Sequence, residues 1–271
     1  MVEELPRIFD AKAIVLHRAR AARIAGDTFL VREAADGLAA RLAGIARDFP
    51  RRMELVLDDA ERLVTPEPLD LLTSVLSLHA VNDLPGVLIQ ARRALRPDGL
   101  FLAALFGGET LTEMRQSLAA AELETAGGVS PRVAPFADVR ELGGLLQRAG
   151  FALPVADVER TVARYGDVFS LVRDLRAMGE TNALTERSHR PMRRGLLAAA
   201  MAHYAANFSD ADGKLRATFD IVYLTGWAPH ESQQQPLTPG SARTRLAAAL
   251  GTTERSAGES APRPQRTPIR D

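Results

Sequence analysis

Short continuous apolar runs alternate with stretches of helical spacing in the middle of the chain. Residues 53–57 (MELVL) and 100–106 (LFLAALF) form runs that predict buried strands, and residues 69–78 (LDLLTSVLSL) form a third run with a β-branched centre. Residues 85–95 begin with a proline and space their apolar side chains as a helix does. This order predicts a βαβ unit whose parallel sheet is covered on both faces, and therefore an α/β fold.

Helical and strand patterns continue beyond this unit. Further helices are predicted at 110–123, 138–149, 167–178, 191–208 and 241–250, and further strands at 151–155 and 218–224. Thr110 and Glu113 have the spacing of a capping box. We expect a helical arm over 1–48 and a main domain over 49–250, with a helical insertion at about 166–208. The segment 251–271 has almost no large apolar residues, which predicts a disordered tail.

Charge and composition exclude several classes of protein. Lys and Arg together number 34, as do Asp and Glu, and this net charge of zero argues against a nucleic-acid binder. Cysteine is absent and the five histidines are far apart, so we expect neither thiol chemistry nor a metal site. The N-terminus has no secretory signal pattern, and no apolar stretch is long enough to cross a bilayer. We therefore expect a cytoplasmic protein without a membrane span.

Four short motifs follow one another around the predicted strands: DAERL (59–63), LDL (69–71), SLHAVND (77–83) and LRPDG (95–99). In this order they resemble the second half of a Rossmann-like methyltransferase domain that uses S-adenosylmethionine. The resemblance implies that Asp59, with Ala60 beside it, contacts the adenine amine and that Leu78 and His79 lie beside the cofactor. Two of these motifs, DAERL and SLHAVND, follow strand ends, where ligands bind in open α/β sheets.

The role of His79 has two interpretations, a general base or a side chain that shapes the cofactor pocket. The catalytic residues are unknown at this stage. Methyl transfer from a sulfonium is mostly a matter of aligning donor and acceptor and excluding water, so no catalytic triad is expected.

Longer motifs narrow the resemblance. They are Phe9-Asp10 before an Arg/Ala-rich helix, then residues 77–86, 106–115, 174–184 and 224–246. In this order they are similar to bacterial relatives of NADH dehydrogenase assembly factor 5, which resemble the malonyl-carrier-protein O-methyltransferase of biotin synthesis. The resemblance implies methyl transfer to an oxygen or nitrogen of a small-molecule or protein acceptor. The alternative is a non-methylating assembly factor, protein-binding or arginine-hydroxylase-like, with a subunit of respiratory complex I as its partner.

One part of the family pattern is missing. Family members open with a strand that ends in a glycine-rich loop, followed by a second strand that ends in an acid, but this chain has no glycine between Gly44 and Gly86. A βαβ unit of roughly 30 residues is therefore absent. Either the reading frame is damaged or a genuine deletion has occurred. We expect a Rossmann-like sheet without its first βαβ portion, with an unpaired strand edge and exposed apolar surface.

Overall fold

The computed structural model describes residues 7–24, 28–57, 60–65, 67–234 and 246–253. The chain divides into two units, Met1–Glu231 and Ser232–Asp271. The second unit contains the short helix α8 (Leu246–Ala249), which covers part of the helix predicted at 241–250; residues 241–245 lie outside the described residues. The expected domain boundaries at 48 and 250 and the expected disordered tail stay predictions.

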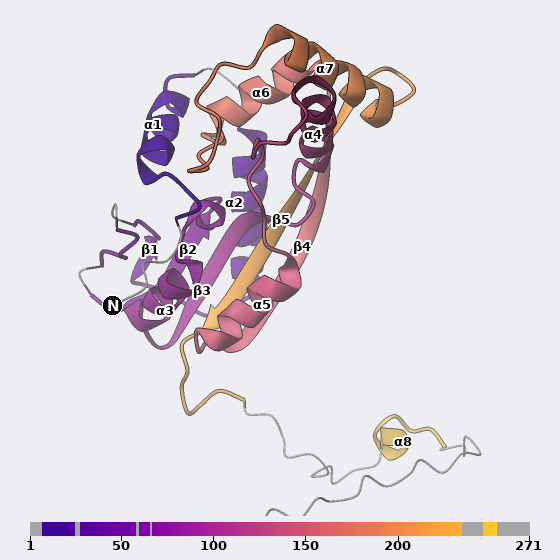
Figure 1. Ribbon diagram of the computed structural model, residues 1–271. Coiled ribbons are helices and arrows are strands. Elements are labelled where there is room, and N and C mark those ends of the chain that lie inside the picture. Colours follow the sequence, from indigo (N-terminus) through magenta and orange to yellow (C-terminus); the bar gives the residue numbers. More distant parts are fainter. Residues whose placement is uncertain (1–6, 25–27, 58–59, 66, 235–245, 254–271) are drawn as a thin grey trace, which may run out of the picture. The chain divides into compact units, whose positions relative to one another are not determined.

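The described residues of the first unit form a five-stranded sheet with the order β1-β2-β3-β5-β4 (Figure 1). Its strands are β1 (Arg52–Glu54), β2 (Leu69–Val75), β3 (Leu95–Gly107), β4 (Ala152–Tyr165) and β5 (Leu215–Trp227). The first three are parallel, whereas β5 runs antiparallel to both β3 and β4. The sheet is therefore mixed, and the predicted βαβ unit, with α3 between β2 and β3, forms its parallel half.

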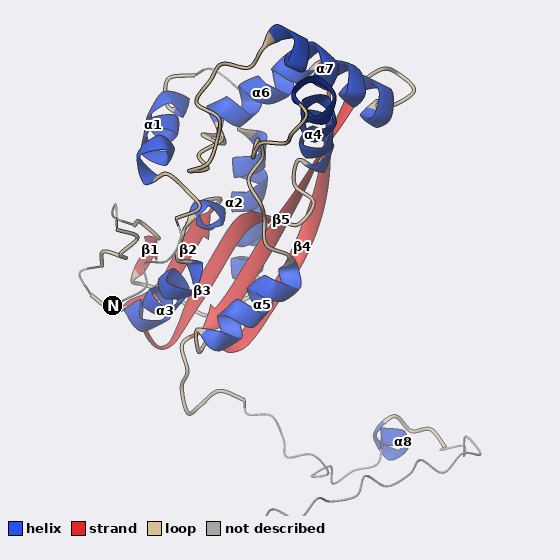
Figure 2. Cartoon of the chain, in the orientation of Figure 1, coloured by secondary structure: helices blue, strands red, loops and turns tan. Residues whose placement is uncertain are grey.

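Helices cover both faces of the sheet, as the apolar pattern predicts (Figure 2). The described helices of the first unit are α1 (Ala11–Ala21), α2 (Phe29–Ala43), α3 (Leu84–Ala94), α4 (Thr112–Ala126), α5 (Val139–Arg148), α6 (Val168–Ala177) and α7 (Arg194–Phe208), with a 3₁₀ turn, η1 (Leu78–Ala80), after β2. Along β3, Leu102 and Phe106 pack on the α2 face, whereas Phe101 packs on the α3 and α5 face. No described helix is long and apolar enough to cross a membrane.

Two local predictions are wrong. The strand predicted at 53–57 is instead a three-residue strand at the sheet edge, because its pairing with β2 ends at Glu54. Beyond the strand, Leu55 is buried but Val56 is 62% exposed. The capping box at α4 does not form, since Leu111 is the N-cap with a φ of 55°. Thr110 donates to the Gly107 carbonyl, and Glu113 is buried and accepts from the Thr218 backbone N–H.

Candidate functional site

A pocket of about 550 Å³ lies beyond the carboxyl ends of β2 and β3. Open α/β sheets bind ligands at this edge. Its floor includes Phe106 and Phe219, η1 contributes His79, and one wall includes Phe136. The cover is formed by α1, α6 and the residues that follow α6, which contribute His17, Arg18, Leu175, Arg176, Glu180, Asn182, Arg187 and Met192. The helical insertion between β4 and β5 thus lies over a largely apolar cavity with basic side chains in its cover.

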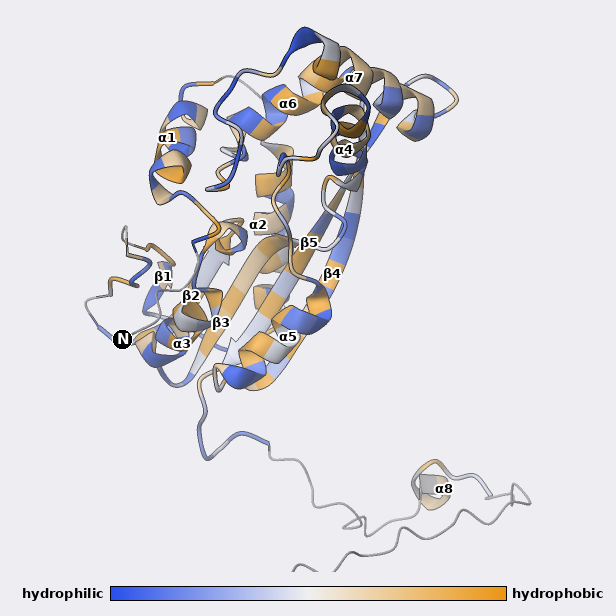
Figure 3. Cartoon of the chain, in the orientation of Figure 1, coloured by the Kyte–Doolittle hydropathy of each residue, from blue (hydrophilic) through white to orange (hydrophobic). Residues whose placement is uncertain are grey.

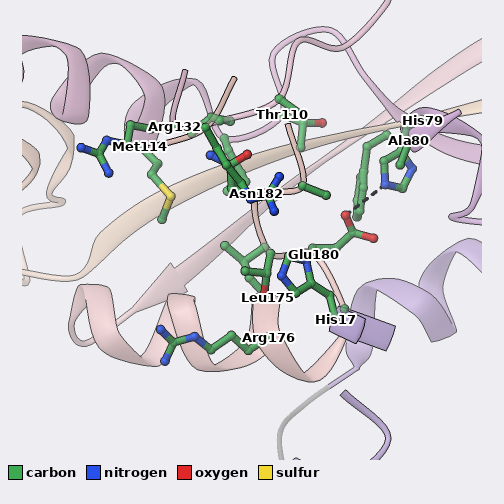
Figure 4. A pocket seen from close by; sticks show the side chains of 18 of the residues that line it. His17, His79, Ala80, Thr110, Met114, Arg132, Leu175, Arg176, Glu180 and Asn182 are labelled. Carbon is green, nitrogen blue, oxygen red and sulfur yellow. Dashed lines mark hydrogen bonds and ion pairs between the residues drawn. The ribbon is translucent and has the colours of Figure 1, made fainter. Parts of the chain in front are cut away.

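His79 and Glu180 face each other in this pocket (Figure 4). Their Nε2 and Oε2 atoms are 3.0 Å apart, and the His79 side chain is only 5% exposed. The rings of Phe106 and Phe136 flank the imidazole at 5.0 and 6.0 Å. A carboxylate accepts, so Nε2 carries the hydrogen in this pair. The contact ties η1, at the end of β2, to the segment that follows α6.

His17 on α1 holds the same segment from another side. Burial lowers the pKa of His17 below its ordinary value of 6.5, and the nearby Arg187 and Arg20 lower it further. A hydrogen bond with the Thr181 backbone acts in the opposite direction without reversing the shift. The surroundings of His17 therefore favour the neutral form of its imidazole over the charged form.

Residues 8–10 form a strap across the segment that follows α6. The Asp10 backbone N–H donates to the Ala183 carbonyl at 2.8 Å, and the Arg187 guanidinium donates to the Asp10 carboxylate at 2.9 Å. On its other side the strap contacts the loop after η1: the Phe9 N–H donates to Asn82 Oδ1 at 2.8 Å, and Asn82 Nδ2 donates back to the Phe9 carbonyl at 3.2 Å. The strap therefore joins the sheet edge to the pocket cover.

Glu122 on α4 organises the remaining wall. Its buried carboxylate accepts from the Ser130 backbone N–H at 2.6 Å and from the Arg132 guanidinium at 2.7 Å. Burial alone would raise the pKa of Glu122, but the hydrogen bonds from Ser130 and Arg132 outweigh it and the pKa is lowered. Asn182 Nδ2 donates to the Pro131 carbonyl at 2.9 Å, which joins this wall to the pocket cover.

The structure brings one of the four residues named from the sequence into the pocket, namely His79. Leu78 is buried in the core on the α3 face, and Ala60 is exposed in a turn after β1. Asp59 lies outside the described residues. The cofactor roles of these four residues stay predictions. Glu180 was missed, although it belongs to the DLRAMGETNAL motif, because nothing in its local pattern indicates a partner 101 residues away.

The residues after β1 do not fit S-adenosylmethionine in the way the resemblance implies. Only glycine lets the backbone approach the methionine and ribose parts closely, and this connection has none. None of its described residues, 55–57 and 60–65, lines the pocket. The carboxylate of Glu61, the described acid of this connection nearest to Asp59, is already bonded to the chain itself: it accepts from the backbone N–H groups of Asn82 and Asp83.

Comparisons with known proteins agree with this architecture. A family described as "Methyltransferase domain" matches residues 31–103. Malonyl-acyl-carrier-protein O-methyltransferase of Methylovorus sp. (strain MP688) is 36% identical over 215 residues, which cover 78% of this chain and 68% of that protein. Mitochondrial arginine-hydroxylase NDUFAF5 is 43% identical over 197 residues in Dictyostelium discoideum, covering 73% of this chain and 45% of that protein. The human NDUFAF5 is 46% identical over 188 residues, which cover 69% of this chain and 54% of that protein.

The structure is an α/β fold with a pocket at the carboxyl edge of its parallel strands. The chain belongs to the methyltransferase-domain family that contains malonyl-acyl-carrier-protein O-methyltransferase and arginine-hydroxylase NDUFAF5. It spans about half the length of the NDUFAF5 proteins of Dictyostelium and human. Among solved structures, the YcgJ protein of Bacillus subtilis is 13% identical and covers 62% of this chain and 68% of that one, with a TM-score of 0.38. That likeness is too low to bear on function.

Proposed function

We propose that the chain binds the acceptor group of a partner protein in its pocket and acts in the maturation of respiratory complex I, without transferring a methyl group. One observation carries the proposal: a covered pocket lies at the carboxyl ends of β2 and β3, whereas the residues after β1 do not fit the cofactor. Family members named arginine-hydroxylase NDUFAF5 support a role other than methyl transfer.

The surface around the pocket supports a protein partner. The exposed basic residues on and just after α1, on α6, and just before and at the start of α7 are Lys12, Arg18, Arg20, Arg23, Arg173, Arg176, Arg190, Arg193 and Arg194. Residues 11–24 include no acid, although the whole chain has a net charge of zero. Ile8, Val15 and Leu16, close in sequence to the cations of α1, are 47%, 56% and 54% exposed. Along α1, hydrophobic and hydrophilic residues alternate (Figure 3). A basic surface with exposed apolar side chains suits a partner surface that is acidic and partly apolar.

Methyl transfer from S-adenosylmethionine to an oxygen or nitrogen acceptor is the second candidate. The 36% identity to a malonyl-acyl-carrier-protein O-methyltransferase favours it. Cofactor dependence discriminates the two functions, because partner binding needs no cofactor and methyl transfer cannot occur without one. The expected cytoplasmic location stays a prediction under both.

Complementation tests the proposed role. Cells of the source organism that lack this chain should regain NADH:quinone oxidoreductase activity in their membranes when the wild-type chain is returned. The double variant Arg18→Glu with Arg176→Glu reverses two charges in the pocket cover and should restore much less activity. Arg148→Glu, an exposed charge reversal on α5, is the matched control and should behave as wild type. Equal restoration by the double variant and the control would contradict the proposal.

A further inference from the structure

The pocket beyond β2 and β3 has an aromatic interior. The centre of the Phe106 ring lies 6.3 Å from that of Phe136 and 6.0 Å from that of Phe219, and all three line the pocket. Met114 and Met192 line it as well, and thioethers make favourable contacts with aromatic rings. The volume of about 550 Å³ is typical of sites that enclose a ring-sized group. These walls favour an aromatic occupant, because contacts between rings add to the gain from burying apolar surface.

A fixed hydrogen-bond acceptor lies in this interior. Glu180 is the only acid among the described residues that line the pocket (Figure 4). Its Oε2 is 3.0 Å from His79 Nε2, and its backbone N–H donates to the Leu175 carbonyl at 2.8 Å, so the carboxylate is held from two directions. Its Oε1 has no hydrogen-bond partner among the described residues, and the side chain is 24% exposed. An occupant with a donor can therefore bond to Oε1.

The charge of the pocket disfavours a cation. Four of the described arginines line it, and two of them are paired with acids that do not. The other two, Arg18 and Arg176, are exposed, and no described acid forms an ion pair with either. Two unpaired guanidinium groups outweigh the one carboxylate, so a guanidinium or ammonium occupant would be repelled. The donor that reaches Glu180 should therefore be neutral.

We infer that the partner protein inserts a tyrosine side chain into the pocket and that its hydroxyl donates to Glu180 Oε1. A hydroxyl and a carboxylate form a short, charge-assisted hydrogen bond. A phenylalanine would take water from the carboxylate without replacing it, and a serine or threonine would leave the aromatic interior unfilled. Acidic neighbours of the tyrosine would face Arg18 and Arg176. The inference rests on the proposed function, because it names the group that the partner presents.

Three blocked amino acids test the choice of occupant. N-acetyltyrosinamide and N-acetylphenylalaninamide differ by one hydroxyl, and N-acetylargininamide carries a cation. In NMR titrations of wild type labelled on its methionine methyl groups, the signals of Met114 and Met192 should shift, whereas those of Met53 and Met201, which do not line the pocket, should not. The tyrosine amide should bind about tenfold more tightly than the phenylalanine amide, and the arginine amide most weakly.

Three results of these titrations would overturn the inference. They are the absence of shifts with the tyrosine amide, equal affinities for the tyrosine and phenylalanine amides, and tighter binding of the arginine amide.

Variants locate the donor and the repulsion. Glu180→Gln keeps the shape of the side chain without its charge and should reduce the preference for tyrosine over phenylalanine to about threefold. Glu186→Gln, an exposed acid outside the pocket lining, is the matched control and should keep the wild-type preference. An unchanged preference in Glu180→Gln would overturn the inference. Arg18→Gln with Arg176→Gln gives a test that leaves Glu180 in place: the double variant should bind the arginine amide more tightly than wild type does, and an unchanged affinity would be the contrary result.

Flanking charge distinguishes a partner's tyrosine from a free phenol. An acetylated Glu-Tyr-Glu amide should bind about tenfold more tightly than a Lys-Tyr-Lys amide at low ionic strength, and the difference should shrink as salt is added. Equal affinities would assign the pocket to a free phenol and overturn the inference. All these titrations use the purified chain without S-adenosylmethionine. Tyrosine selectivity with failed complementation would reject the complex I role alone, whereas complementation without tyrosine selectivity would reject this inference alone.

Discussion

At the scale of single residues, the contact between His79 and Glu180 carries much of the link between the sheet edge and the pocket cover. His79 is buried between two aromatic rings, and Nε2 is the atom through which it bonds to Glu180. We expect His79→Ala and Glu180→Ala each to reduce the free energy of unfolding by about 1–3 kcal/mol, since each leaves a polar partner unpaired.

A double-mutant cycle on this pair gives the sharper test. The double variant should be less destabilised than the sum of the two single variants, with a coupling of about 1 kcal/mol in urea unfolding. Additive effects of the two substitutions would show that the pair does not interact in the folded protein.

The lowered pKa of His17 predicts that the stability of the protein depends on pH. Its pKa in the folded protein is lowered from 6.5 by burial, so the unfolded chain takes up this proton first as the pH falls. The contribution of His17 to stability is therefore complete above about pH 6.5 and decreases as the pH falls toward its folded pKa. Urea unfolding at several pH values should show a smaller loss of stability in this window for His17→Gln than for wild type. An identical pH profile for the two proteins would contradict this assignment.

The motif around His79 could be recognised from the sequence because it follows the end of a predicted strand and lies among other motifs that resemble the methyltransferase family. Its partner Glu180 could not, since the contact forms only when the insertion folds back over the sheet. The contacts of Glu61 could not be predicted either. Its carboxylate accepts hydrogen bonds from the backbone N–H groups of Asn82 and Asp83, and backbone groups leave no pattern in the sequence.

At the scale of elements, the segment between α4 and α5 is ordered by one buried carboxylate. Glu122→Gln removes the charge that pairs with Arg132 and weakens the bonds to Ser130. We expect a loss of about 2–4 kcal/mol and faster hydrogen exchange over residues 127–136. Glu124→Gln, an exposed neighbour on the same helix, is the matched control. Equal exchange in both variants would contradict a role for Glu122 in shaping this wall.

The pKa of Glu122 gives this prediction a second readout. Because the folded pKa is lowered, the stabilisation is present above the ordinary value of 4.5 and is lost as the pH falls through the folded pKa. The stability difference between wild type and Glu122→Gln should therefore shrink under acidic conditions.

Apolar spacing predicts most helices well; the helices predicted to begin at Asp138 and Asp167 are α5 and α6, which begin one residue later with these aspartates as N-caps. The capping-box prediction is wrong at α4, because Thr110 bonds to β3 and β5 and Glu113 bonds to β5, so neither side chain is free to cap the helix. Apolar spacing also underestimates β4, which continues to Tyr165 because β5 pairs with it along nearly its whole length.

At the scale of the whole sheet, β1 forms a short edge in the part of the chain that the structure describes. The missing βαβ portion predicts exposed apolar surface there, and Val56 and Val64 are 62% and 64% exposed. We expect Val56→Lys with Val64→Lys to reduce self-association in light scattering with little change in melting temperature. Unchanged self-association would show that this edge is not the surface responsible.

The central βαβ unit and the α/β class follow from the sequence because parallel strands buried on both faces read as continuous apolar runs. The order of the strands does not follow from the sequence. β5 comes after β4 and the helical insertion along the chain, yet it lies between β3 and β4 in the sheet. Sequencing the transcript across the codons for residues 49–59 distinguishes a genuine deletion from a damaged reading frame.

We propose that this family member binds its acceptor without S-adenosylmethionine. Calorimetric titration of the folded wild-type protein with S-adenosylmethionine is the decisive measurement, with Asp59→Ala titrated alongside. We expect no binding heat up to millimolar ligand for either protein. Saturable binding in the micromolar range that Asp59→Ala abolishes would contradict this proposal and would identify the chain as a cofactor-binding methyltransferase.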